Sequence, residues 1–494
     1  MWCRIWQGAG VGEQGISTAG RIGLLLAPAI LVLVLLTAPP EGLSVAAWRT
    51  AGVVGVMAVL WMTEAIPIPV TALLPLVFFP LLGVAGVKEA AVPYANPVIY
   101  LFLGGFILAL GLQRWRLHER VAYWIVGHTG ARASRVLAGF MVATAFVSMW
   151  INNSATTVMM LPMAVSVAGL FAARLGADEK AKDGLGLALL LGVAYAASIG
   201  GVGTLIGTAP NAFMAGFLRE NYGMRVGFAE WMLVGVPFVI AGIAVAHGVL
   251  ARMCLADRRL EVPGLREKVR GELTKLGPWA RGEKAVAVVF CVAAVLWMAQ
   301  PLLKPILPGL SDAVIGMAAG IALFLIPVDW RKGQFVLAAR DLRDLPFGVL
   351  VLLGGGLSMA EMVDGTGLAA WLGTWTTGWQ VLPIALVVVL ITLGIVFLTE
   401  LTSNTATTAT FLPVVASVAV GMGQAPMVLV LPAAIAASCA FMLPVGTPPN
   451  AIVFASGLVP LPRMARVGLV MNVLFAALIP LIVLSLGMWV FGRS

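Results

Sequence analysis

Charged residues, histidine and cysteine are all scarce in this chain of 494 residues. Only 11% of the residues are Asp, Glu, Lys or Arg, whereas soluble domains carry about 25%, so the chain cannot coat several soluble domains with charge. The four cysteines and three histidines are scattered singly, which argues against a disulfide framework or a metal cluster. The composition excludes a soluble enzyme, a secreted disulfide scaffold and, despite a net charge of +9, a nucleic-acid-binding protein.

Hydrophobic sequence is abundant instead, at 61% of the residues and a mean hydropathy of +1.01. A helix that crosses a bilayer needs about 20 predominantly apolar residues. The stretch after Arg21 has no convincing signal-peptide cleavage site, so we interpret it as the first span. The sequence predicts an all-α polytopic membrane protein embedded in the lipid bilayer, with about eleven transmembrane helices. The candidate spans are roughly 22–39, 51–65, 68–85, 97–113, 186–218, 228–251, 285–303, 310–327, 347–360, 427–457 and 467–491.

Two further apolar segments, roughly 136–171 and 383–420, are too long for one straight helix. Each has a polar cluster at its middle, at 152–154 and 403–405. Polar, non-helical backbone at membrane depth is tolerated only where it is buried in protein or lines a cavity. We therefore predict two re-entrant hairpins with these clusters at their tips.

The chain contains an internal repeat of three motifs in the same order. Asn152-Asn153-Ser154-Ala-Thr-Thr recurs as Ser403-Asn404-Thr405-Ala-Thr-Thr, 251 residues later. The sequence LGG at 103–105 recurs at 353–355, and GTAPN at 207–211 recurs as GTPPN at 446–450, at offsets of 250 and 239 residues. Three ordered matches predict two structurally related halves.

The distribution of positive charge predicts the orientation. With a cytoplasmic N-terminus and hairpins that return to their side of entry, 25 of the 31 Lys and Arg residues fall on the cytoplasmic side, as the positive-inside rule requires. The segment before the first tip is basic, but its counterpart before the second has Glu361 and Asp364 and no Lys or Arg through Gln380. Corresponding segments therefore lie on opposite faces, which predicts inverted-topology repeats.

These features divide the chain into four parts. Residues 1–50 form the N-terminal segment and first helix, and 252–284 form a charged cytoplasmic linker. The first inverted repeat is 51–251, with its tip at 152–154 and a broken helix at 186–218. The second is 285–494, with its tip at 403–405 and a broken helix at 427–457.

The broken helices and the tips carry the groups that can bind ions. Glycine and proline interrupt the spans at 200–210 and 444–449, and proline leaves carbonyls without a helical donor. Such carbonyls, with Ser, Thr and Asn oxygens, are ligands for a hard cation at the midplane of a secondary transporter. No Lys or Arg lies in these motifs, so an anion would be held by amides, hydroxyls, helix ends and bound cations.

Two carboxylates, Glu64 and Glu400, lie at membrane depth, where an acid is by default a proton-relay candidate. Glu64 precedes Pro67 and Pro69 at an expected cytoplasmic turn, and we interpret it as structural. Glu400 lies three residues before the second tip, and the sequence leaves its role open between a relay and a structural residue.

At these motifs the sequence resembles the divalent anion:sodium symporter family, which carries di- and tricarboxylates. The resemblance runs from WMTEAIPIP at 61–69 to the end of the chain. The paired tips match the family's Ser-Asn-Thr motifs, and 207–211 and 446–450 match its broken-helix motifs. The first tip departs from the pattern, with Asn152 in place of Ser and Ser154 in place of Thr.

The resemblance implies two sodium sites, with Na⁺ as the coupling ion and no other cofactor, and a homodimer in which one domain moves as an elevator. It implies a bacterial inner-membrane location and import of C4-dicarboxylates such as succinate, malate and fumarate. The sodium ligands it implies are Ser148, Asn152, Asn153 and Gly203 in the first site, and Thr399, Ser403, Asn404, Met442 and Gly446 in the second. The substrate contacts it implies are Asn153, Ser154, Asn404, Thr405, Thr208, Thr447 and Pro448.

Two other interpretations remain at this stage. One is a sodium-independent anion exchanger, or a citrate or sulfate carrier, of the same fold. The other is an integral-membrane enzyme that uses Asn, Ser and Thr. The enzyme interpretation lacks support, because no His or Cys lies beside either tip to form a nucleophile–base pair.

Overall fold

A computed structural model describes residues 17–174, 179–255, 261, 264–375 and 381–492. Helices are the dominant secondary structure of these residues, and nine of the helices within them are long and apolar enough to cross a membrane. A two-stranded antiparallel hairpin, β1 (Pro327–Asp329) and β2 (Gln334–Phe335), is the described exception. The predicted all-α polytopic fold is therefore confirmed.

The first half contains thirteen described helical elements, of which the first begins at Thr18. Ser17 and Ser44 cap the first two helices, since each hydroxyl accepts a backbone N–H three residues on, at 3.0 Å in both cases. The elements are α1 (Thr18–Leu36), α2 (Val45–Thr63), α3 (Ile68–Thr71), α4 (Pro75–Leu81), α5 (Val87–Ala91), η2 (Val92–Ala95), α6 (Pro97–Arg114), α7 (Leu117–Gly127), α8 (Ala133–Ser148), α9 (Asn153–Arg174), α10 (Glu179–Gly201), α11 (Ala209–Tyr222) and α12 (Phe228–Met253).

The second half follows the short amphipathic helix α13 (Leu265–Leu276), which lies in the predicted linker. Its helices are α14 (Arg281–Leu303), α15 (Asp312–Leu325), η3 (Ala339–Asp344), α16 (Phe347–Gly365), α17 (Leu368–Thr374), α18 (Ile384–Leu398), α19 (Asn404–Gly421), α20 (Met427–Ala437), α21 (Pro448–Ala455), α22 (Leu461–Ile482), the π-helical η5 (Val483–Gly487) and α23 (Met488–Phe491).

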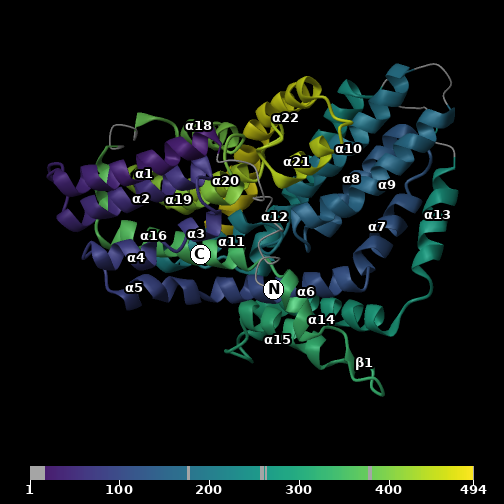
Figure 1. Ribbon diagram of the computed structural model, residues 1–494, viewed down its shortest axis with the longest axis horizontal. Helices are drawn as coiled ribbons and strands as arrows, with labels where there is room; N and C mark the ends of the chain where they lie inside the picture. Colours follow the sequence, from purple (N-terminus) through teal and green to yellow (C-terminus); the bar gives the residue numbers. More distant parts are fainter. Residues whose placement is uncertain (1–16, 175–178, 256–260, 262–263, 376–380, 493–494) are drawn as a thin grey trace.

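The helices repeat as the motifs do. The starts of α6, α7, α8 and α9 precede those of α16, α17, α18 and α19 by 250, 251, 251 and 251 residues, and α11 precedes α21 by 239. Figure 1 places the pair α8–α9 toward the right end of the long axis and the pair α18–α19 toward the left. The half-helix α11 packs on α19 and α20, while α21 packs on α9 and α10. Each broken helix thus reaches the hairpin of the other half.

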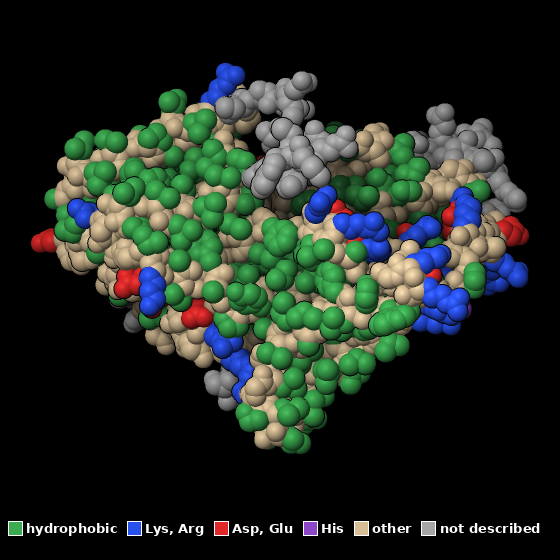
Figure 2. All heavy atoms as spheres, turned by 60° about the horizontal axis from the view of Figure 1, so that its bottom comes forward, with side chains coloured by type: hydrophobic (Ala, Val, Ile, Leu, Met, Phe, Trp, Pro, Cys, Tyr) green, Lys and Arg blue, Asp and Glu red, His purple; other side chains and the backbone are tan. Residues whose placement is uncertain are grey.

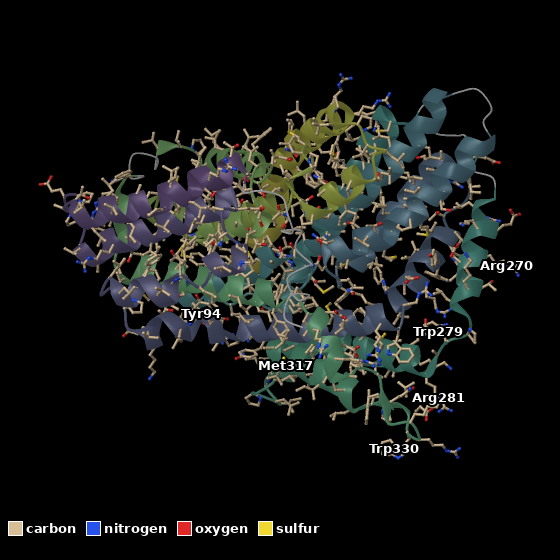
Figure 3. All side chains as sticks on the ribbon, in the orientation of Figure 1. Tyr94, Arg270, Trp279, Arg281, Met317 and Trp330 are labelled. Atoms are coloured by element: carbon tan, nitrogen blue, oxygen red, sulfur yellow. The ribbon has the colours of Figure 1, made fainter. Side chains whose placement is uncertain are left out.

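The surface is that of a protein surrounded by lipid. Figure 2 shows hydrophobic side chains over most of the visible face, with Lys and Arg gathered mainly toward one end. Helix α14 exposes Val288, Val295 and Leu302, which are 63%, 65% and 80% accessible. At the lower right of Figure 3, Arg270 of α13, Trp279 and Arg281 near the start of α14, and Trp330 of the β-hairpin lie toward the same end.

Several elements differ from the expectation. The predicted span 68–85 consists of the short helices α3 and α4, because prolines at 69, 75 and 80 cannot all sit inside one continuous helix. The helices α7 and α17 were not predicted. Glu64 is exposed and ends α2 in a left-handed conformation, with φ of 46°, which agrees with a structural turn.

Candidate functional site

The first oxygen cluster lies where α8 turns into α9 and meets α10. Ser148 is fully buried, and its Oγ lies 2.7 Å from both Asn153 Oδ1 and the carbonyl oxygen of Ala197. A serine hydroxyl has one proton and can donate it to only one acceptor at a time. Three oxygens therefore converge on a single proton, and the surplus acceptor can serve as a ligand for a cation.

The second cluster has the same construction. Thr399 is fully buried, and its Oγ1 lies 3.0 Å from Asn404 Oδ1 and 2.9 Å from the carbonyl oxygen of Ala437. The same end of the Asn404 amide also lies 3.0 Å from the carbonyl oxygen of Gly446. Ser148 and Thr399 are 251 residues apart, so the two clusters occupy matching positions in the two halves.

The orientation of the Asn404 amide decides what the second cluster can bind. Hydrogen bonding to the described residues favours the nitrogen toward the cluster, where it donates to Thr399 Oγ1, Gly446 O and Ala437 O at 3.0, 3.0 and 3.1 Å. If its oxygen faces the cluster, four oxygens converge, which suits a hard cation held by carbonyl and side-chain oxygens. A bound sodium ion would hold the amide in this second orientation, and its nitrogen would then point out of the cluster.

Two asparagines form side-chain hydrogen bonds to the backbone carbonyls of the broken helices. Asn211 Nδ2 donates to the carbonyls of Gly201, Val202 and Thr204 at 3.2, 3.3 and 2.8 Å. Asn450 Nδ2 does the same to Ala440 and Leu443, at 3.1 Å each. Both side chains are completely buried. They belong to the repeated motifs at 207–211 and 446–450, so the repeat was the signal that could have revealed this role.

Four helix N-termini bring positive dipole ends to the tips and breaks, namely those of α9, α11, α19 and α21. Pro210 and the pair Pro448-Pro449 lie in the first turns of α11 and α21, where a missing N–H costs nothing. Ser154 and Thr405 are half-buried at the starts of α9 and α19. Among the described residues, neither hydroxyl has a hydrogen-bond partner, so both are available to a ligand.

The structure brings some of the predicted sodium ligands together and leaves others apart. Ser148 with Asn153, and Thr399 with Asn404 and Gly446, share the two clusters. The amides of Asn152 and Met442 are engaged differently: Asn152 Oδ1 accepts the Ser154 N–H at 2.8 Å, and the Met442 N–H bonds Glu400.

The other predicted residues lie at the helix breaks and helix starts. Gly203 packs against Met149 and has its carbonyl toward Gly235. Ser403 is the N-cap of α19, and Thr208 and Thr447 are the N-caps of α11 and α21. Pro448, the first residue of α21, is exposed. Two contributors were missed, the carbonyls of Ala197 and Ala437, because every residue has a carbonyl and only the fold selects these two.

Within the described ranges, no group of three or more His, Cys, Asp or Glu side chains could hold a metal ion. The available cation ligands are neutral amide, hydroxyl and carbonyl oxygens. This donor set fits an alkali cation better than a transition metal, which favours imidazole and thiolate.

Known proteins resemble this chain along nearly its whole length. Residues 19–492 match the family model described as the sodium:sulfate symporter transmembrane region. A protein of Staphylococcus saprophyticus named a sodium-dependent dicarboxylate transporter is 39% identical over 468 residues, which cover 94% of this chain and 90% of that protein. A transporter of the same name from Staphylococcus aureus is 38% identical over 480 residues, covering 95% and 92%.

Two solved structures share the fold at low sequence identity. The YdaH transporter of Alcanivorax borkumensis has a TM-score of 0.55 at 12% identity, with 94% of this chain and 98% of that chain covered. The MtrF protein of Neisseria gonorrhoeae has a TM-score of 0.55 at 13% identity, with 99% and 98% covered. The resemblance seen in the tip and break motifs is confirmed, and the chain belongs to the sodium:sulfate symporter family, whose named relatives are membrane transporters and not enzymes.

Proposed function

We propose that this protein is a secondary active transporter that imports C4-dicarboxylates, such as succinate, malate and fumarate, together with sodium ions. The observation that carries the proposal is the pair of clusters at matching positions, in each of which a buried hydroxyl, the side-chain amide of a tip asparagine and a backbone carbonyl converge. The relatives named as sodium-dependent dicarboxylate transporters support the same ion and substrate class.

One sodium ion would bind each cluster. The first would use Ser148, Asn153 and the carbonyl of Ala197, and the second would use Thr399, Asn404 and the carbonyls of Ala437 and Gly446. The remaining predicted ligands, Asn152, Gly203, Ser403 and Met442, would complete the two sites from the adjoining turns and breaks. Sodium accepts irregular sets of oxygen ligands from unwound helices, so the two sites need not be identical.

The substrate would lie between the tips, with one carboxylate toward each half. Its oxygens would accept from the amides of Asn153 and Asn404 and the hydroxyls of Ser154 and Thr405, with Thr208, Thr447 and Pro448 at the starts of α11 and α21. Two related tips suit an anion with two charged ends. The helix dipoles and two sodium ions would supply the positive charge that the tips and breaks lack.

The conformational cycle would be an elevator movement of the hairpins and broken helices within a homodimer in the bacterial inner membrane, with the N-terminus in the cytoplasm. The cross-packing of α11 on α19 and of α21 on α9 supports a single moving body, because both candidate sites would travel with it. The gathering of Lys and Arg toward one end supports the orientation.

Uptake into proteoliposomes tests the function. Labelled succinate should accumulate when sodium is high outside, and uptake should fall to background when choline replaces sodium. Unlabelled malate and fumarate should compete, whereas sulfate and citrate should compete weakly. Uptake that needs internal dicarboxylate but no sodium gradient would show an exchanger, and stronger competition by sulfate or citrate would show a different substrate.

A further inference from the structure

Glu400 has its carboxylate inside the second broken helix. The residue lies in the turn of the second hairpin and is only 3% exposed. Its Oε1 accepts the N–H groups of Phe441 and Met442 at 2.6 and 2.8 Å, and its Oε2 accepts that of Leu443 at 2.9 Å. Successive backbone N–H groups that converge in this way form an anion-binding concavity. The side chain thus holds the backbone of the break by three bonds.

A fourth donor comes from another helix. Asn472 of α22 is fully buried, and its Nδ2 donates to Glu400 Oε1 at 2.8 Å. No Lys, Arg or His forms an ion pair with Glu400 anywhere in the described part of the chain. A buried carboxylate needs both hydrogen bonds and a positive partner. Its hydrogen bonds are present, and a cation bound from solution can supply the positive partner that the described residues lack.

The second oxygen cluster is the nearest place for that partner. Thr399 is the preceding residue, and its hydroxyl is part of the cluster. Gly446 contributes a carbonyl to the cluster and also touches the carboxylate, since a Cβ on Gly446 would lie 2.9 Å from Glu400 Oε2. A cation in the cluster would therefore lie beside Thr399, which precedes Glu400, and beside Gly446, which borders the carboxylate.

The first half has no such group. The position that corresponds to Glu400 is Met149, 251 residues earlier. The N–H groups of Val202 and Gly203 instead bond the carbonyls of Ile199 and Gly200, at 3.2 and 2.9 Å, and continue the turn of the helix. The two clusters share a hydroxyl, an asparagine amide and a helix carbonyl, but only the second has a carboxylate beside it.

We propose that Glu400 is a positioning residue that makes the two cation sites unequal: it fixes the second break and supplies the charge that draws sodium to the second cluster first. This inference rests on the proposed sodium coupling. Sodium at the second site would neutralise the buried carboxylate, so sodium alone, without substrate, would stabilise the protein. The first cluster, which is neutral, would fill at higher sodium concentration.

The test measures the thermal stability of the purified protein without substrate at increasing sodium concentrations. The sodium midpoint is the concentration that gives half of the sodium-dependent stabilisation. The sodium dependence of succinate uptake is then measured for the same variants. Glu400→Gln should raise that concentration by at least about tenfold, because a unit charge a few ångströms away is lost, and Glu400→Asp should raise it less. The control is Glu283→Gln, which neutralises a different buried carboxylate, also 3% exposed, that is paired with Arg120. It should lower the melting temperature without moving the sodium midpoint.

Asn472→Leu is the second variant, for use if Glu400→Gln does not fold. Asn472 belongs to α22 and is part of neither the broken helix nor the oxygen cluster, and its replacement removes one hydrogen bond to the Glu400 carboxylate. The sodium midpoint should rise severalfold, as in Glu400→Gln. An unchanged midpoint in the folded Glu400→Gln protein, or in Asn472→Leu if that is the one that folds, would overturn this inference. A wild-type protein without sodium-dependent stabilisation or uptake would instead overturn the proposed function.

Discussion

Asn153 and Asn404 each place one end of a side-chain amide in an oxygen cluster. Asn→Asp at either position keeps the shape and the cation ligand but replaces the amide donor with negative charge toward the substrate. A lost hydrogen bond to a charged group is worth about 1.5–3 kcal/mol, so succinate affinity should fall roughly ten- to hundredfold. Sodium-dependent thermal stabilisation should persist or strengthen in each variant, while succinate uptake should nearly vanish. Normal uptake by both variants would place the substrate elsewhere.

Thr399 contributes a hydroxyl whose loss leaves the shape of the second cluster intact. In Thr399→Val the contacts at 3.0 Å to Asn404 and 2.9 Å to Ala437 disappear, and the sodium midpoint should rise about fivefold, equivalent to about 1 kcal/mol. Thr392→Val is the matched control, because Thr392 is equally buried on α18 and its hydroxyl bonds Val388 O at 2.7 Å. Thermal shift against sodium concentration should separate them. Equal midpoints would show that Thr399 is an ordinary helix threonine.

Among the elements, the end of α10 approaches the first tip so closely that it requires glycine. A Cβ on Gly201 would lie 2.5 Å from Asn153 Oδ1, so Gly201→Ala should push the amide out of its cluster and abolish most succinate uptake. A Cβ on Gly186 of the same helix would lie 3.6 Å from the Ala168 side chain, an ordinary van der Waals contact. Gly186→Ala should retain uptake and raise stability by up to about 1 kcal/mol. Full uptake by the Gly201→Ala protein would contradict the close approach.

The helix starts at the polar tips and the interruptions of the two broken helices could be predicted, because polar clusters, glycines and prolines stand out in apolar sequence and occur twice; that the hairpins are re-entrant stays a prediction. α9 and α19 begin at Asn153 and Asn404, within the predicted tips. The helices α7 and α17 could not be predicted as spans, since they have only 11 and 7 residues. The carbonyls of Ala197 and Ala437 were equally hidden, because a backbone acceptor has no sequence signature.

Glu400 shows a different limit of sequence reasoning. Its position at membrane depth indicates that it matters, but a buried acid can relay a proton, bind a cation or hold backbone N–H groups. Only the fold shows that residues 441–443 present three donors to it. The repeat then gives the comparison with Met149, which the sequence already contained and which becomes informative once the bonds are known.

Across the whole molecule, a buried ion pair connects the linker region to the first half. Arg120 of α7 pairs with Glu283 of α14, donates to Gly277 O at 3.0 Å and lies over the Trp279 ring, 5.3 Å from its centre. Removal of one partner of a buried pair costs about 3–5 kcal/mol. Glu283→Gln should therefore lower the melting temperature of the purified protein in detergent. Arg120→Met combined with Glu283→Leu should recover part of the loss, and no recovery would show that the charges themselves are required.

The inverted arrangement of the two halves can be tested at a pair of matching positions. Arg132 and Pro383 immediately precede α8 and α18, are 251 residues apart and are both exposed. In a protein whose four native cysteines are replaced, Arg132→Cys should react from the cytoplasmic face with a membrane-impermeant thiol reagent, and Pro383→Cys from the outer face. The reason is charge: the basic segment before the first hairpin resists translocation, and its counterpart before the second contains no Lys or Arg. Intact cells expose the outer face to the reagent, and inverted vesicles expose the cytoplasmic face. Reaction of both cysteines from the same side would show that the two halves are parallel. In that case the two oxygen clusters could not approach a shared site from opposite faces, and sodium coupling through paired tips would fail with the topology.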